Sequence, residues 1–318
     1  MGHGAFGVAY CFVKADYVAN MQSRDAARSS FEESNSSPPP TIVVKITRTD
    51  NYDCVRAECR QTNSFDQSGN RVPLISSTPM NIQGPEEQGD VKHHFKTKEG
   101  VYVSVCVMPT YDTDLWQFLK DTTNRMRMQL AGEAGFLKIA FQILECLAYL
   151  RSCNLWYEDL KLSNVLVDLS ASTRDTFHCV LGDVGAIYDR DCFCALPGTF
   201  PSPLSITENA AVPGCLWCFG VFIVEYVVNV QEVAHMRALL YDNMQYVPGL
   251  EKDARYERAC RARLNMKMLS WAIPQDWKTV HKLHEMCCPE GTSASLRVQD
   301  TEIMRRMRDI IDQALSNL

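Results

Sequence analysis

Four polar side chains near the middle of the chain are of the types that handle phosphate groups. Asp159, Lys161 and Asn164 stand together before the apolar run 165–167, and Asp183 follows the next apolar run. A carboxylate and an amide oxygen can share a divalent cation with phosphate oxygens, because hard cations take oxygen ligands. A second carboxylate can orient a hydroxyl group for attack on phosphorus. Asp and Asn are also common turn residues, so this stretch is either an ordinary polar turn or a site that moves phosphate.

A glycine cluster at the start of the chain has the spacing of a phosphate-binding loop. Gly2, Gly4 and Gly7 fit the pattern G-x-G-x-x-G. Glycines let backbone N–H groups approach phosphate oxygens, because no Cβ intervenes. A structural turn would explain the same spacing. The residues at 8–13 predict a strand after the cluster, whereas a dinucleotide-binding loop would open a helix, so the dinucleotide interpretation is disfavoured.

A lysine at the end of a β-branched run is the next candidate for phosphate binding. Lys45 follows the run 42–44, which predicts a strand. An unpaired ammonium group is costly to bury, so Lys45 needs an anion unless it lies on an edge strand in water. Glu58 stands thirteen residues further on, in a segment that we expect to form a short helix, and is the candidate partner.

The order of the expected elements predicts an α+β chain. The first third is rich in strand patterns, at 8–13, 42–46 and 101–108. The segments 17–40 and 63–98 in this third are polar, rich in Ser and Pro, and typical of insertions. From Glu133 onward, apolar residues recur at helical spacing. The run 219–226 predicts a helix that is buried on all sides, and a last helix is expected from Asp300. We therefore expect two lobes, one rich in strands and one helical.

Composition excludes several classes of protein. The net charge of −6 over 318 residues gives no electrostatic case for a nucleic-acid partner. The most apolar segment, 219–230, is too short to span a membrane and contains Glu225. The start of the chain does not have the pattern of a signal peptide. The 14 cysteines are therefore expected to be reduced thiols of an intracellular protein, in the cytoplasm or nucleus, and we interpret Cys215 and Cys218 as core thiols rather than zinc ligands.

Together and in this order, the motifs resemble the catalytic domain of eukaryotic protein kinases over essentially the whole chain. The resemblance implies ATP and Mg²⁺ as cofactors and a protein hydroxyl as acceptor. Asp159 ends the motif Y-E-D, where the family has H-R-D, and would be the catalytic base. Lys161, two residues later, is the arrangement of Ser/Thr kinases rather than Tyr kinases. Asn164 and Asp183, the latter in D-V-G in place of D-F-G, would bind the metal.

The resemblance also assigns the residues that would bind ATP. The glycine cluster would be the loop over ATP, and Lys45 would hold the α- and β-phosphates with Glu58 as its helix partner. The stretch 107–111 resembles the hinge between the lobes. The implied cofactor-binding residues are Gly2, Gly4, Phe6, Gly7, Ala9, Lys45, Met108 and Thr110.

As a whole, the resemblance implies a two-lobed protein-kinase-like fold. One kinase domain would cover 1–318, with an N-lobe at 1–108 and a C-lobe at 109–318. The strand that precedes the glycine loop in the family is missing from the sequence, so we expect either a start further upstream or an N-lobe without this strand. The stretch 108–115 resembles herpesvirus-type Ser/Thr kinases, which would place the enzyme in a host cell.

Three positions depart from the family pattern. Tyr157 replaces the family His and keeps a ring that can pack. Glu158 replaces the Arg that receives an activation-loop phosphate, so we expect that switch to be absent. Cys215 replaces the Asp that anchors the catalytic loop, so the N–H groups that the Asp would accept from need another partner. Cys215, the missing first strand and the absence of a clear A-P-E motif motivate a second hypothesis, a pseudokinase that binds partners without catalysis. A third, a small-molecule phosphotransferase, is disfavoured by Lys161.

Overall fold

A computed structural model describes the following residues of the chain: 2–4, 7–13, 41–49, 94–96, 102–109, 111–152, 155–157, 159–169, 178–182, 187–189, 215–244, 252–287 and 293–317. The chain divides into two compact units, which meet in the sequence between Thr110 and Tyr111. In the first unit, the structure describes the strands and the register in which they pair.

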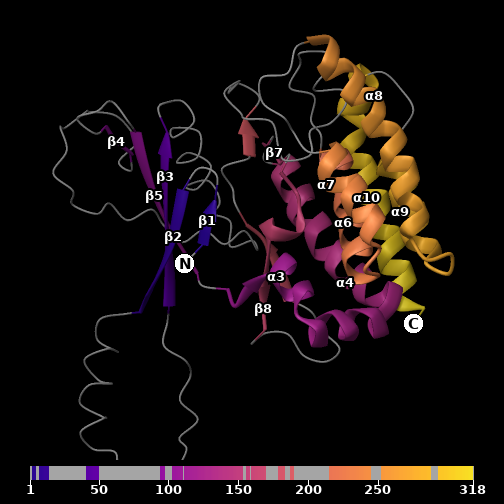
Figure 1. Cartoon of the computed structure of the whole chain (residues 1–318), viewed down its shortest axis with the longest axis horizontal. Helices are drawn as coiled ribbons and strands as arrows, with labels where there is room; N and C mark the ends of the chain where they lie inside the picture. Colours follow the sequence, from indigo (N-terminus) through magenta and orange to yellow (C-terminus); the bar gives the residue numbers. More distant parts are fainter. Residues whose placement is uncertain are drawn as a thin grey trace, which may run out of the picture. The chain divides into compact units, whose positions relative to one another are not determined.

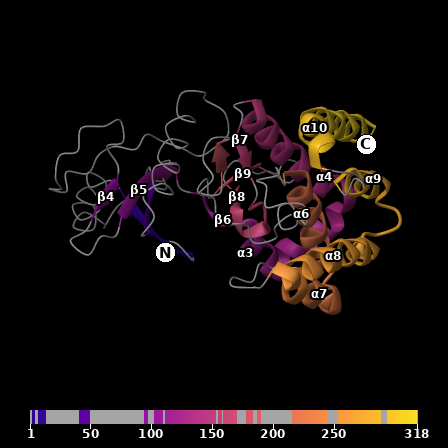
Figure 2. The same cartoon turned by 90° about the horizontal axis from the view of Figure 1, so that it is seen from above.

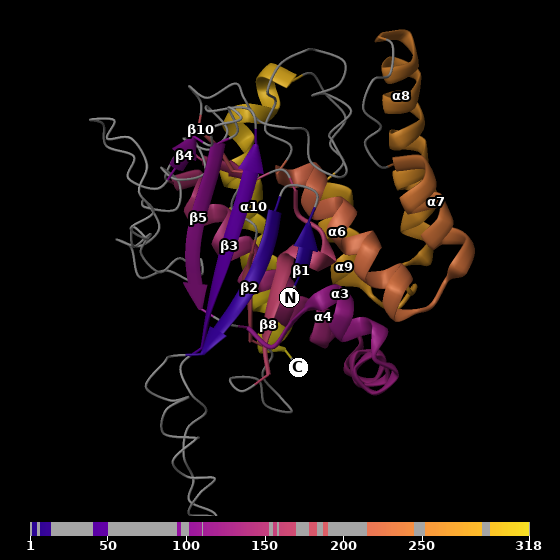
Figure 3. The same cartoon turned by 60° about the vertical axis from the view of Figure 1, so that its left-hand side comes forward.

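The first unit contains a five-stranded antiparallel sheet in the order β1-β2-β3-β5-β4. Figures 1 and 3 show its strands side by side. Together they confirm the strands that the sequence predicts around 8–13, 42–46 and 101–108. The five strands are β1 (Gly2–Gly4), β2 (Gly7–Val13), β3 (Thr41–Thr49), β4 (His94–Lys96) and β5 (Tyr102–Pro109).

Lys45 lies in the middle strand of this sheet. It pairs in register with Ala9 of β2 on one side and with Cys106 of β5 on the other. The alternative that Lys45 lies on an edge strand is therefore wrong. The β-branched residues of β3 favour a strand that is paired along both edges.

The glycine cluster forms the end of a β-hairpin. β1 and β2 pair antiparallel, with Gly4 opposite Gly7, and the strand continues to Val13. This confirms the prediction that a strand, not a helix, follows the glycines. Glycines suit such a tight reversal because they tolerate backbone conformations that other residues avoid.

The second unit is mainly helical, with two small sheets. The antiparallel strands β6 (Thr113–Asp114), β8 (Val165–Asp168) and β9 (His178–Leu181) form one sheet, and β7 (Leu155–Tyr157) pairs with β10 (Ile187–Asp189). A short 3₁₀ turn, η1 (Leu162–Asn164), precedes β8. Strands and segregated helices together make this an α+β chain. The helices are α3 (Leu115–Lys120), α4 (Thr122–Ser152), α6 (Cys215–Val230), α7 (Ala234–Met244), α8 (Lys252–Leu269), α9 (Lys278–Cys287) and α10 (Ser293–Ser316).

Helix α6 is the centre of the second unit's core. Every one of its residues is buried, which confirms the prediction for 219–226. The helices α4, α7, α8, α9 and α10 all contact it, and Figure 2 shows it among them. Gly220 permits the close approach of α9, since a Cβ added there would lie 2.7 Å from the Cβ of Cys287. A helix this apolar is stable in water only when it is covered on all sides.

Helix α4 bends at a glycine. Gly132 has a positive φ of 57°, which separates 122–131 from the helix that continues from Glu133. The change to helical character predicted at Glu133 is thus confirmed for the part of α4 that packs in the core. The expected start of the last helix at Asp300 is wrong, because α10 already begins at Ser293. The residues before Asp300 include Ala, Leu and Arg, which are strong helix formers and extend the helix.

Candidate active site

The polar stretch found in the sequence lies between two strands of the helical unit. Asp159 follows β7, Lys161 directly precedes η1, and Asn164 is the last residue of η1 before β8 begins. The apolar residues of β8 fix this position, because Val165 and Val167 are fully buried. We call residues 159–164 the catalytic loop.

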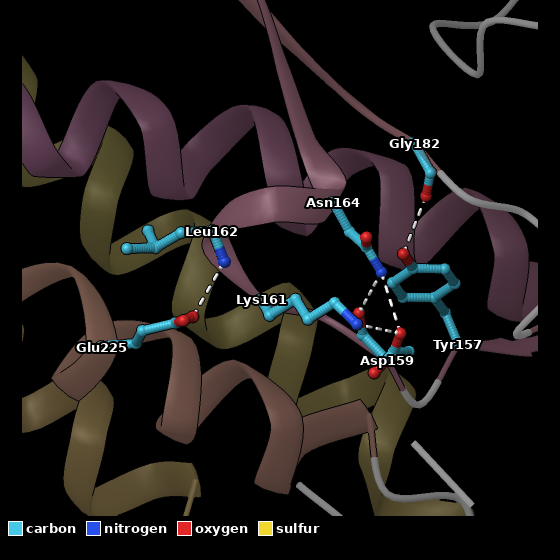
Figure 4. A network of polar contacts seen from close by, with 7 residues as sticks. All are labelled: Tyr157, Asp159, Lys161, Leu162, Asn164, Gly182 and Glu225. Atoms are coloured by element: carbon cyan, nitrogen blue, oxygen red, sulfur yellow. Dashed lines mark hydrogen bonds and ion pairs between the residues drawn. The ribbon is translucent and has the colours of Figure 1, made fainter. Parts of the chain in front are cut away.

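Three side chains of the catalytic loop meet in one cluster, shown in Figure 4. The Lys161 Nζ donates to Asp159 Oδ2 at 2.7 Å. The Asn164 Nδ2 donates to the same oxygen at 3.0 Å and to the main-chain oxygen of Asp159 at 2.8 Å. The side chain of Asp159 is only 13% exposed, so these charge-assisted bonds act where water competes weakly. The carboxylate is therefore held in one direction.

The cluster extends to the residue before Asp183. The Gly182 N–H donates to the main-chain oxygen of Asn164 at 2.6 Å. Its carbonyl oxygen accepts from the Tyr157 hydroxyl at 2.8 Å. Asp183 itself lies outside the described residues. A main-chain hydrogen bond thus joins Asn164 to the residue that directly precedes Asp183.

Asn164 has one amide oxygen with which it could contact a cation. Its Nδ2 is used by Asp159, so its Oδ1 is the atom with which it would contact a cation. Figure 4 shows this oxygen on the far side of the amide from Asp159. The residue is buried, which fixes the amide. An amide oxygen held in this way fits a hard divalent cation such as Mg²⁺.

Tyr157 and Cys215 connect the catalytic loop to helix α6. The ring of Tyr157 is fully buried, which confirms that it packs. Its N–H donates to Cys215 Sγ at 3.4 Å. For this N–H, the partner is thus Cys215 itself; the N–H of Glu158 lies outside the described residues. A thiol sulfur is a weak acceptor, but it can satisfy a buried N–H.

Glu225 is a residue of this region that the sequence analysis did not assign to the site. It is 3% exposed, and its Oε2 accepts from the Leu162 N–H of the catalytic loop at 2.8 Å. Burial raises the pKa of Glu225 to about 7, although hydrogen bonds from Tyr241 and Leu162 and the charge of Lys161 favour the ionised form. The available signal was a single carboxylate in an otherwise apolar helix.

The remaining predicted residues lie in the first unit or outside the description. Gly2 and Gly4 are in β1, Gly7 and Ala9 are in β2, Lys45 is in β3, and Met108 is in β5. The register places Lys45 beside Ala9, and Ala9 beside Gly2. Three of the predicted ATP-binding residues thus follow one another across neighbouring strands. The residues that lie outside the described parts are Phe6, Glu58 and Thr110.

No protein-family model matches the chain, and no curated protein matches it. In the described part of the chain, the helices are either too short or too polar to cross a membrane.

Proposed function

We propose that the chain is a Ser/Thr protein kinase that transfers the γ-phosphoryl group of ATP to a protein hydroxyl. The supporting observation is the bonded cluster of Asp159, Lys161 and Asn164, which Gly182 extends to the position before Asp183. An ordinary polar turn satisfies its side chains from its own backbone. Here the side chains bond one another, and a segment from the end of another strand joins them.

The two units fit the lobes of a kinase-like fold in this proposal. The first unit supplies a glycine hairpin and a lysine on the middle strand of an antiparallel sheet. The second supplies the catalytic loop on a helical core. Lys45 would hold the α- and β-phosphates and Glu58 would fix Lys45, as the resemblance implies.

The chemistry assigned to the catalytic loop is proton transfer and positioning. Asp159 would accept the hydroxyl proton as the substrate oxygen bonds to phosphorus and the bond from phosphorus to the ADP oxygen breaks. Lys161 would balance negative charge at the transferred group, and its bond to Asp159 directs the carboxylate. Asn164 and Asp183 would hold Mg²⁺, which neutralises phosphate charge when bound. Positioning and electrostatics supply most of the rate in such reactions.

The contact between Cys215 and Tyr157 favours this proposal over a pseudokinase. The missing Asp at position 215 was one reason to expect a catalytic loop without its anchor. In the structure, Cys215 Sγ occupies that role for the Tyr157 N–H. The loop is therefore anchored despite the substitution.

The test is transfer of labelled phosphate from ATP with Mg²⁺ to a basic protein such as myelin basic protein. We expect the wild type to transfer phosphate, and Asp159→Ala and Lys45→Met to abolish transfer. Matched controls are Asp276→Asn and Lys278→Met, since both residues are exposed and far in sequence from the catalytic loop. A folded wild type without transfer would refute the proposal. If ATP and Mg²⁺ also left its melting temperature unchanged, the result would indicate a pseudokinase.

A further inference from the structure

Helices α6 and α7 share a buried polar network beneath the catalytic loop. The Tyr241 hydroxyl of α7 donates to Glu225 Oε1 at 2.7 Å. Asn229, one turn after Glu225, donates from Nδ2 to the Glu225 main-chain oxygen at 2.7 Å and to the Tyr241 hydroxyl at 3.4 Å. Both carboxylate oxygens of Glu225 thus accept a hydrogen bond, one from α7 and one from the loop. A buried carboxylate is costly, so its presence in an apolar helix calls for an explanation.

The network holds the catalytic loop at the point where its backbone turns. Leu162 is the first residue of η1, and its side chain is fully buried. Lys161 stands at the cap position of η1 but gives no side-chain capping bond. The acceptor for the Leu162 N–H comes instead from Glu225, on a helix distant in sequence. Leu162 lies between Lys161 and Asn164, so its backbone orients both ends of the Asp159 cluster.

The ring of Tyr241 is held from a third helix. Trp116 of α3 contacts it edge to face, with ring centroids 5.5 Å apart. Lys120 of the same helix lies 5.1 Å from the centre of the Trp116 ring. Such aromatic pairs have preferred geometries, so Trp116 restricts the direction of the Tyr241 hydroxyl. A continuous chain of contacts runs from α3 through Tyr241 and Glu225 to Leu162.

We propose, on the basis of the proposed kinase function, that Glu225 and Tyr241 are positioning residues of the catalytic loop. Glu225 fixes the backbone at Leu162, and Tyr241 fixes the direction of the Glu225 carboxylate. Neither residue touches the reacting groups. Their effect on the reaction passes through the orientation of Asp159 and Asn164.

The test compares two tyrosines that differ in one hydrogen bond. Tyr241→Phe removes the hydroxyl that donates to Glu225. Tyr226→Phe is the matched control, because its fully buried hydroxyl has no hydrogen-bond partner among the residues that the structure describes. Glu225→Gln is the second variant and tests the loop contact directly. All are made in the full chain, and rates are normalised to the folded fraction, measured by near-ultraviolet circular dichroism.

Two readouts are followed in each variant. The first is amide hydrogen exchange in peptides that cover the catalytic loop, with peptides from α4 as internal reference. Loss of one buried hydrogen bond should accelerate loop exchange about tenfold in Tyr241→Phe and Glu225→Gln and leave Tyr226→Phe unchanged. The second is phosphoryl transfer, where we expect kcat to fall about fivefold to tenfold with the KM for ATP within about twofold.

The two readouts separate failure of this inference from failure of the proposed function. Unchanged loop exchange in both variants overturns the inference whether or not the wild type is active. Faster loop exchange with an unchanged kcat in an active enzyme also overturns it. An inactive wild type refutes the kinase function, and loop exchange then decides alone whether Glu225 and Tyr241 hold the loop.

Discussion

Glu225 predicts a pH dependence of stability that can be isolated by one substitution. Burial raises its pKa from 4.5 to about 7, so the native state binds a proton that the unfolded chain has released between these values. Glu225 therefore favours folding below its unfolded pKa. Its contribution to the free energy of unfolding is lost as the pH rises through about 7. For shifts of this size, linkage gives a loss of about 2.5 kcal/mol between about pH 5 and about pH 8.

Glu225→Gln removes the titration but keeps the size and polarity of the side chain. The measurement is urea unfolding of the full chain, followed by tryptophan fluorescence at several pH values. The difference in unfolding free energy, wild type minus variant, should fall by about 2.5 kcal/mol over that range. Every other titrating group is present in both proteins and cancels. Glu285→Gln on the exposed face of α9 is the control and should give a flat difference. A difference for Glu225→Gln that stays flat within about 0.5 kcal/mol would refute the argument from burial.

Three further predictions concern the packing of the helical unit. Burial lowers the pKa of His284 to about 4, so this residue should cost the wild type about 2.5 kcal/mol of unfolding free energy as the pH falls from about 8 to about 4.5. His284→Phe should abolish this loss, measured by the same urea titration. Gly220→Ala should destabilise by about 1–3 kcal/mol in thermal unfolding, because its Cβ would meet the Cys287 Cβ and force the helices apart; an unchanged melting temperature would contradict this. Cys215→Ala removes the sulfur that accepts from the buried Tyr157 N–H and should destabilise by about 1–2 kcal/mol. Cys215→Ser should destabilise less, and equal losses of stability would show that the sulfur contact contributes nothing.

Short-range patterns predicted the elements that carry the site. The β-branched run before Lys45 predicted a strand, because side chains that branch at Cβ fit a pleated sheet. The period of apolar residues after Glu133 predicted a helix whose apolar face is buried. The spacing of Asp159, Lys161 and Asn164 brought together residues that bond one another, because they lie within one short loop.

Contacts between distant segments were not predictable in the same way. The sequence showed that Glu225 was unusual in an apolar helix, but nothing local indicated that its partner was a backbone N–H at Leu162. Likewise, the pairing of β3 on both edges depends on where β2 and β5 lie, and this is why Lys45 could have been on an edge strand. The period of a pattern specifies a buried face but not which group is buried against it.

The two contacts of helix α6 explain why the catalytic loop tolerates a weak anchor. Cys215 and Glu225 are ten residues apart on this helix, a distance of about 15 Å at the helical rise. Their partners, Tyr157 and Leu162, are five residues apart in the sequence, a stretch that spans at most about 17 Å when extended. This stretch is long enough to reach both anchors on α6, and Lys161, just before Leu162, has extended angles, φ −154° and ψ 164°.

A segment held at both ends by one helix has less conformational freedom than a segment held at one end. The sulfur at Cys215 need only satisfy one N–H, because Glu225 fixes the other end with a short bond from a carboxylate. If the chain is a kinase, as proposed, then Cys215 in place of Asp weakens one of two anchors on a single helix. Loss of Glu225 should release Asp159 and Asn164 more than loss of Cys215, because the carboxylate bond is the stronger of the two and lies nearer to Asn164 in the sequence.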